Sequence, residues 1–111
     1  MRHTFADAAS RDLDEIAASY ASDNPDTAAR FIAEVHRVMM LLLEHPLAGE
    51  RIDDAHRHYP INGLPFHLNY RVDADTNCVR VIAVSDQRLR PGYWRNRVEA
   101  PVVAYEIALA A

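Results

Sequence analysis

Hydrophobic positions follow two different periods along the chain, and the change falls after Pro46. Before Pro46, apolar side chains recur every three or four residues, which is typical of amphipathic helices. We predict a first helix over 8–22 and a second over 25–44. Asn24 suits the N-cap of the second helix, and Pro25 suits its first position, where no backbone donor is needed. Pro46 cannot continue this helix and therefore ends it.

From residue 56 onward the period becomes two, which is typical of strands that bury one face. We predict strands over 56–61, 66–72 and 79–84, with the polar turn at 73–77 joining the last two as a hairpin. If Ile61 faces Phe66 across the preceding turn, Tyr59 faces Leu68, and the core face also carries Tyr70 and Val72. In the last strand, one face carries Val79, Val81 and Ala83, and the other carries Arg80, Ile82 and Val84.

The order of these elements predicts an α+β domain. A short strand within 1–5 precedes the helices. The helices should form an antiparallel hairpin packed on one face of a three- to four-stranded antiparallel sheet. We expect 47–54 to be a loop, and Pro60 places its own strand at an edge or leaves it unpaired at that point. The tail at 98–111 fits either a short helix or an added strand.

Composition and charge exclude several classes of protein. The 111 residues are enough for one domain with a real core. The net charge is −4 and the pI is about 5.8, which opposes a nucleic-acid-binding body. No apolar run approaches the roughly 18 residues of a membrane span, and no signal peptide follows Met1. We therefore expect a cytoplasmic protein without membrane contact, in which Cys78 forms no internal disulfide.

A basic segment with aromatic residues follows the last predicted strand directly. Loops at strand ends are where rigid scaffolds commonly present binding residues. The candidate target-binding residues are Arg88, Arg90, Tyr93, Trp94 and Arg95. Two plainer interpretations stay open: the arginines form a solvated turn, and the two aromatic residues pack over the end of the sheet.

The face opposite the predicted core collects polar side chains, namely His56, His58, His67, Asn69 and Arg71. The histidines suggest zinc, but no cysteine or carboxylate stands nearby at ligand spacing, so we expect no metal and no cofactor. A plain interpretation of Arg71 is a solvated arginine on this face of the sheet that pairs with an acidic side chain. Asp12 and Glu15 are interpreted as the exposed face of the first helix.

Five motifs in one order resemble the ParE/RelE toxin superfamily of bacterial type II toxin–antitoxin systems. They are the start from Phe5 to Ile16, the Glu44–Gly49 segment that ends the second helix, and the stretches 70–72, 81–84 and 87–94. The resemblance covers about residues 1–97. It implies the two-helix, antiparallel-sheet fold described above and a toxin that is neutralised by an antitoxin.

The superfamily divides by target. RelE-like members are ribosome-dependent mRNA endoribonucleases, whereas ParE-like members poison DNA gyrase and are not nucleases. The resemblance maps a nuclease set onto Arg71, Arg88 and Tyr93, but Asp86 stands where nucleases often carry a histidine or a basic residue. The chain also contains no lysine, although cations must balance the charge that builds on a cleaved phosphate. Both departures favour a gyrase inhibitor that is not an enzyme.

A cognate antitoxin is the expected partner. The apolar stretch at 102–109 and an exposed sheet edge are surfaces that a partner's helix or strand can complete. We expect no sequence-specific binding of nucleic acid by the chain alone. A third hypothesis is an inactive relic of a toxin that acts only as an antitoxin-binding module.

Overall fold

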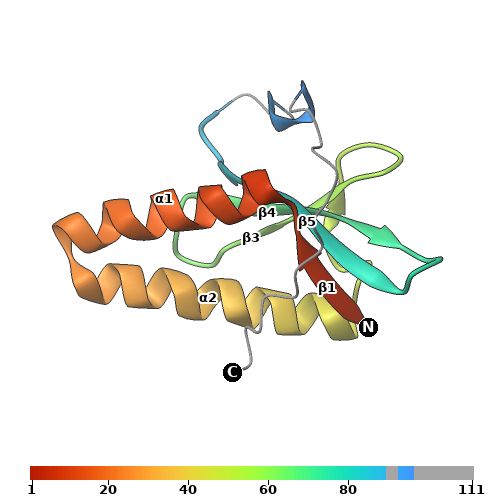
Figure 1. Cartoon of the computed structure of the whole chain (residues 1–111), viewed down its shortest axis with the longest axis horizontal. Helices are drawn as coiled ribbons and strands as arrows, with labels where there is room; N and C mark the ends of the chain where they lie inside the picture. Colours follow the sequence, from red (N-terminus) through yellow and green to blue (C-terminus); the bar gives the residue numbers. More distant parts are fainter. Residues whose placement is uncertain (90–92, 97–111) are drawn as a thin grey trace.

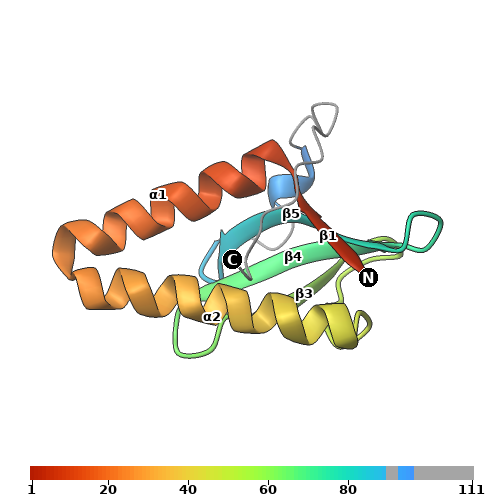
Figure 2. The ribbon, with the colours of Figure 1, turned by 60° about the horizontal axis from the view of Figure 1, so that its bottom comes forward.

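A two-helix hairpin lies on one face of a five-stranded sheet in the computed structural model, which describes residues 1–89 and 93–96 (Figures 1 and 2). The predicted tail at 98–111 lies outside the described residues. The sheet has the order β1-β5-β4-β3-β2. In chain order the elements are β1 (Arg2–Phe5), α1 (Asp7–Asp23), α2 (Pro25–Glu44), β2 (Glu50–Arg51), β3 (Arg57–Pro60), β4 (Phe66–Asp73), β5 (Cys78–Asp86) and the 3-10 turn η1 (Tyr93–Asn96).

The helix boundaries follow the sequence signals closely. The side chain of Asn24 accepts a hydrogen bond from the Asp26 amide at 3.0 Å, and Pro25 opens α2. The α2 residues that face the sheet are fully buried, and they include Phe31, Val35 and Leu42. At about 1.5–3 kcal/mol for each large apolar side chain, this burial is what holds the hairpin on the sheet. No helix among the described residues is long and apolar enough to cross a membrane.

The sheet has five strands, where three or four were predicted, and one of its pairs is parallel. β1 runs parallel to β5, with Arg2 opposite Cys78 and Phe5 opposite Val81. A parallel pair needs a long connection between its strands, and here the connection includes both helices. β2 lies within the segment that was predicted to be a loop and adds a two-residue edge strand to β3. Two residues are too few to show a period, so the sequence gives no signal for β2.

The predicted register of the central strands is confirmed at β3 and β4. Tyr59 lies opposite Leu68, and the amide of Ile61 donates to the carbonyl of Phe66 at 2.9 Å. β2 pairs with β3 only at Arg57 and His58, so no described strand pairs with β3 on that side at Pro60.

A β-bulge overturns the predicted alternation in β5. Asn69 pairs with Ala83, whereas the next residue of β4, Tyr70, pairs with Val81, so Ile82 is the extra residue. The extra residue reverses the faces beyond it. Val84 therefore joins the main core under the helices, and Ala83 joins Ile82 in a second cluster, contrary to the prediction that Ala83 shares a face with Val81.

Asp12 was interpreted as an exposed helix residue, and that interpretation is wrong. Its carboxylate is half-buried and accepts a hydrogen bond from the Val84 amide at 3.0 Å. β1 pairs with β5 only as far as Val81, after which the chain turns into α1. Asp12 therefore satisfies a backbone donor on the part of β5 that β1 leaves uncovered.

Tyr70 ties the loop after α2 to the core. Its hydroxyl donates to the Pro46 carbonyl at 2.8 Å and accepts from the Gly49 amide at 2.9 Å, while its ring is fully buried. Burial raises the pKa of this hydroxyl, so it stays protonated and can donate. Gly49 leaves room for the contact, since an added Cβ would lie 2.5 Å from the hydroxyl oxygen. The packing therefore explains the glycine of the helix-ending motif.

Replacing Tyr70 with phenylalanine should lower the free energy of unfolding by about 1–3 kcal/mol, because two buried backbone groups lose their partner. Urea unfolding followed by circular dichroism measures the change. Tyr59→Phe on the neighbouring strand is the matched control and should cost less. Equal stabilities for the two variants would contradict the role given to the Tyr70 hydroxyl.

Candidate functional site

Arg88 stands at the end of β5 in a fixed position. The Asp86 carboxylate accepts from the Arg88 amide at 2.8 Å and from the guanidinium, Nε to Oδ1 at 2.9 Å and an Nη to Oδ2 at 2.5 Å. The Arg88 side chain is nevertheless 76% exposed, and Leu89 beside it is also exposed. Two parallel hydrogen bonds fix the orientation of the planar guanidinium, and its other edge remains open to a partner.

The same pair decides what Asp86 can do. The hydrogen bonds from Arg88 lower the pKa of the Asp86 carboxyl to about 2. A carboxylate of such low basicity is a poor proton acceptor at neutral pH. Asp86 therefore orients Arg88 and is unsuited to the role of a general base.

Arg71 lies far from Arg88. On β4 it faces Arg80 of β5 across the sheet, near the β4–β5 turn, whereas Phe66 and Asp86 pair at the other end of the ladder. Five residues of strand separate the two ends, which at about 3.3 Å per residue amounts to roughly 16 Å. The two arginines of the suggested nuclease set therefore lie too far apart to bind the same phosphate group.

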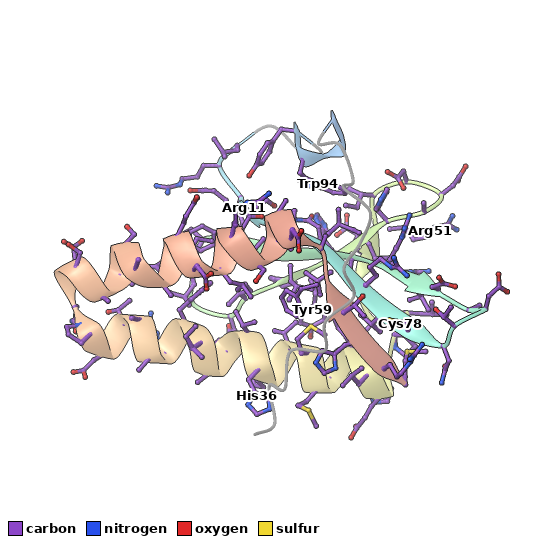
Figure 3. All side chains as sticks on the ribbon, in the orientation of Figure 1. Arg11, His36, Arg51, Tyr59, Cys78 and Trp94 are labelled. Atoms are coloured by element: carbon purple, nitrogen blue, oxygen red, sulfur yellow. The ribbon has the colours of Figure 1, made fainter. Side chains whose placement is uncertain are left out.

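Trp94 is part of the protein interior. Its side chain is only 2% exposed and packs with Ile82 and Ala83 on the sheet face opposite the helices. The ring also meets His56 edge to face, with 5.0 Å between the ring centroids. Figure 3 shows Trp94 reaching from η1 toward the sheet. Tyr93 is half-buried against the same cluster.

The predicted site is therefore divided between two surfaces. Arg88 lies next to α1 residues, whereas Tyr93 and Trp94 cover the other face of the sheet. Arg90 lies outside the described residues, as does the side chain of Arg95, so their placement stays a prediction.

His56, which the sequence analysis placed on the polar face of the sheet, lies in the loop between β2 and β3, and its pairing with Asp53 was not predicted. His56 Nδ1 is 3.0 Å from Asp53 Oδ1, and the same oxygen accepts from the amides of Ala55 and His56 at 2.8 Å. These bonds from the loop lower the pKa of the Asp53 carboxyl to about 2, against the opposing effect of partial burial. The Asp-x-x-His spacing was the available signal. The Asp53–His56 pair holds this loop in place next to Trp94, and the His56 ring packs against Trp94 of the second cluster.

The other two histidines of the predicted polar face stack on each other. The rings of His58 and His67 lie 4.2 Å apart between centroids, and Glu50 is 3.9 Å from His58 Nε2. Residues 1–89 and 93–96 contain no group of three histidine, cysteine or acidic side chains arranged to hold a metal ion.

The stacked pair should make stability depend on pH. Burial, followed by the nearby charge of His58, lowers the pKa of His67 below 6.5, so below pH 6.5 the unfolded chain binds more protons than the folded one. Stability contributed by neutral His67 is complete above pH 6.5 and is lost as the pH falls toward the folded pKa. Urea unfolding at pH 7.5 and 5.5 should show a smaller loss for His67→Asn than for the unchanged chain. Equal losses would contradict this assignment.

The fold matches that of a solved structure. A solved structure, "Chromosomal ParDE TA system from P. aeruginosa", matches with a TM-score of 0.65 and 19% identity over 78% of this chain and 95% of that chain. At this identity the likeness shows the fold alone. It is the α+β fold of a helical hairpin on one face of a sheet.

The sequence comparisons establish the family. The family described as "ParE toxin of type II toxin-antitoxin system, parDE" matches residues 4–91. "Putative toxin Y4kP" of Sinorhizobium fredii (strain NBRC 101917 / NGR234) is 33% identical over 79 residues, which cover 69% of this chain and 81% of that protein. The chain belongs to the ParE toxin family of type II toxin–antitoxin systems.

Proposed function

We propose that this ParE-family toxin inhibits DNA gyrase in the cytoplasm and is neutralised by a cognate antitoxin. The observation that carries the proposal is the Asp86–Arg88 pair. It presents an exposed cation in a fixed geometry and at the same time removes Asp86 as a base. Such a surface suits binding to a protein–DNA complex better than proton transfer.

The separation of Arg71 from Arg88 supports the same choice. Cleavage of RNA through its 2′-hydroxyl requires an acid, a base and cations around one phosphate. Arg71 and Arg88 lie at opposite ends of the β4–β5 ladder, and the oriented imidazole of His56 packs against Trp94. The described residues of the suggested nuclease set therefore offer no convergent centre.

Two measurements test the target. Purified chain added to gyrase and relaxed plasmid should reduce supercoiling, and its induction in cells should trigger a DNA damage response with intact messages. Cleavage of mRNA on ribosomes without an effect on supercoiling would support the endoribonuclease instead. A folded chain that binds its antitoxin but harms neither gyrase nor mRNA would support the inactive relic.

A further inference from the structure

A cavity of about 300 Å³ opens between α1 and the start of β4, next to the proposed target surface. Its wall is apolar on the side of Ile16, Tyr20, Pro65 and Phe66. Its remaining lining residues are Glu15, Ser19 and Arg88. The volume and the apolar wall fit one side chain of the size of leucine or phenylalanine.

The floor of this cavity is held in place by three aromatic rings. The centroids of Tyr20 and Phe31 lie 5.8 Å apart, those of Phe31 and Phe66 lie 5.9 Å apart, and those of Tyr20 and Phe66 lie 6.2 Å apart. Phe31 is fully buried in the main core. The cavity is therefore largely formed before a ligand arrives, which lowers the cost of binding.

The charge that α1 adds to the cavity lining is negative. Arg88 at its edge is paired with Asp86, so these two charges cancel locally, whereas Glu15 adds a carboxylate. The helix that carries Glu15 contains five acidic residues and one basic residue, Arg11. An apolar side chain with a basic neighbour complements this surface in both shape and charge.

We propose that the cavity receives one apolar side chain of the antitoxin, from a segment with lysine or arginine beside it. The inference rests on the proposed antitoxin partner and adds how that partner acts. Because Arg88 lines the cavity, a chain segment seated there covers the surface proposed to bind gyrase. Neutralisation is then direct competition for one place on the toxin.

The test uses the complete ¹⁵N-labelled chain and the probe acetyl-Lys-Leu-Lys-amide, followed by NMR. We expect saturable shifts at Ser19, Phe66 and Arg88. Acetyl-Lys-Ser-Lys-amide lacks the apolar side chain, acetyl-Glu-Leu-Glu-amide reverses the charge, and both should bind more weakly. The absence of shifts at about 10 mM probe, a concentration that detects even millimolar affinity, would overturn the proposal, as would equal binding of all three probes.

Two matched pairs of variants locate the probe. Ser19→Trp fills the cavity mouth and should raise the dissociation constant by roughly tenfold or more, whereas Ala18→Trp adds the same ring to an exposed neighbour outside the cavity. Glu15→Lys should weaken binding more than Asp14→Lys, which changes an exposed acid outside the cavity. Equal effects within either pair would overturn the assignment.

Occupation of the cavity by a different partner, and failure of the proposed gyrase target, would each give a result that differs from the one expected here. Shifts of the same resonances on dilution, without the probe, would assign the cavity to a second copy of the chain instead. The probe experiment does not involve gyrase. If the probe binds in the cavity and the chain leaves supercoiling unchanged, the docking site stands and the gyrase target fails. In the complete toxin–antitoxin pair, Ser19→Trp should reduce neutralisation and Ala18→Trp should not.

Discussion

Toxicity should be lost when Arg88 is replaced by alanine, while the fold and the binding of the antitoxin are kept. The side chain is exposed and bonded only to Asp86 among its described hydrogen bonds, so its removal leaves the core unchanged. A fixed arginine at the centre of an interface commonly contributes more than 2 kcal/mol to binding. That amount corresponds to roughly a 30-fold loss of affinity for the target. Inhibition of supercoiling by purified variants, measured over a range of concentrations, provides the number.

Arg88→Lys is the control for this prediction. Lysine keeps the charge but cannot bind Asp86 through two parallel nitrogens, so it should recover only part of the activity. Antitoxin binding should be kept in Arg88→Ala, because the apolar wall at Ile16 and Phe66 remains and the Asp86 carboxylate, no longer paired, attracts a basic partner segment. Full toxicity of Arg88→Ala would remove Arg88 from the target surface. A loss of toxicity that accompanies unfolding would show a structural role instead.

Much of the fold was readable from the sequence because its signals are local. Asn24 and Pro25 mark the boundary between the helices through capping chemistry that involves only adjacent residues. The register of β3 on β4 follows from the short turn between them, which leaves Tyr59 opposite Leu68. In such cases neighbours along the chain decide the structure, and a single sequence contains the information.

The bulge at Ile82 could not be read in this way. Residues on both sides of it are apolar and buried, since β5 is covered by the helices on one face and by Trp94 on the other. A strand that is buried on both faces loses the alternation of polar and apolar residues that sets a register. Asp12 was missed for a related reason, because the backbone donor that it satisfies lies 72 residues away along the chain.

The candidate site was predicted as one basic and aromatic segment, and the structure shows why this description was too simple. Arg88 and Trp94 are six residues apart, which is enough chain to reach opposite faces of the sheet. Residue type alone does not separate an exposed aromatic contact from a buried one. The alternative that the aromatic residues pack over the sheet is the one that the burial of Trp94 supports.

Replacing Trp94 with alanine should therefore act through stability. Loss of a buried tryptophan typically costs about 3–5 kcal/mol, a large share of the roughly 5–15 kcal/mol that stabilises a domain. Because Trp94 is the only tryptophan, urea unfolding should be followed by circular dichroism, with Trp94→Phe as the control that keeps an aromatic ring on Ile82 and Ala83.

The comparison with Arg88→Ala separates the two roles. Trp94→Ala should lose both stability and toxicity, and Trp94→Phe should recover much of each, since the ring fills most of the space over the second cluster. His56 should lose part of its support as well, because its ring meets Trp94 edge to face. If Trp94→Ala unfolds at the same urea concentration as the unchanged chain and still fails to inhibit gyrase, Trp94 contacts the target, and the packing role is refuted. If it is destabilised, its effect on toxicity reports the folded fraction, and Arg88 remains the residue through which target contact is measured.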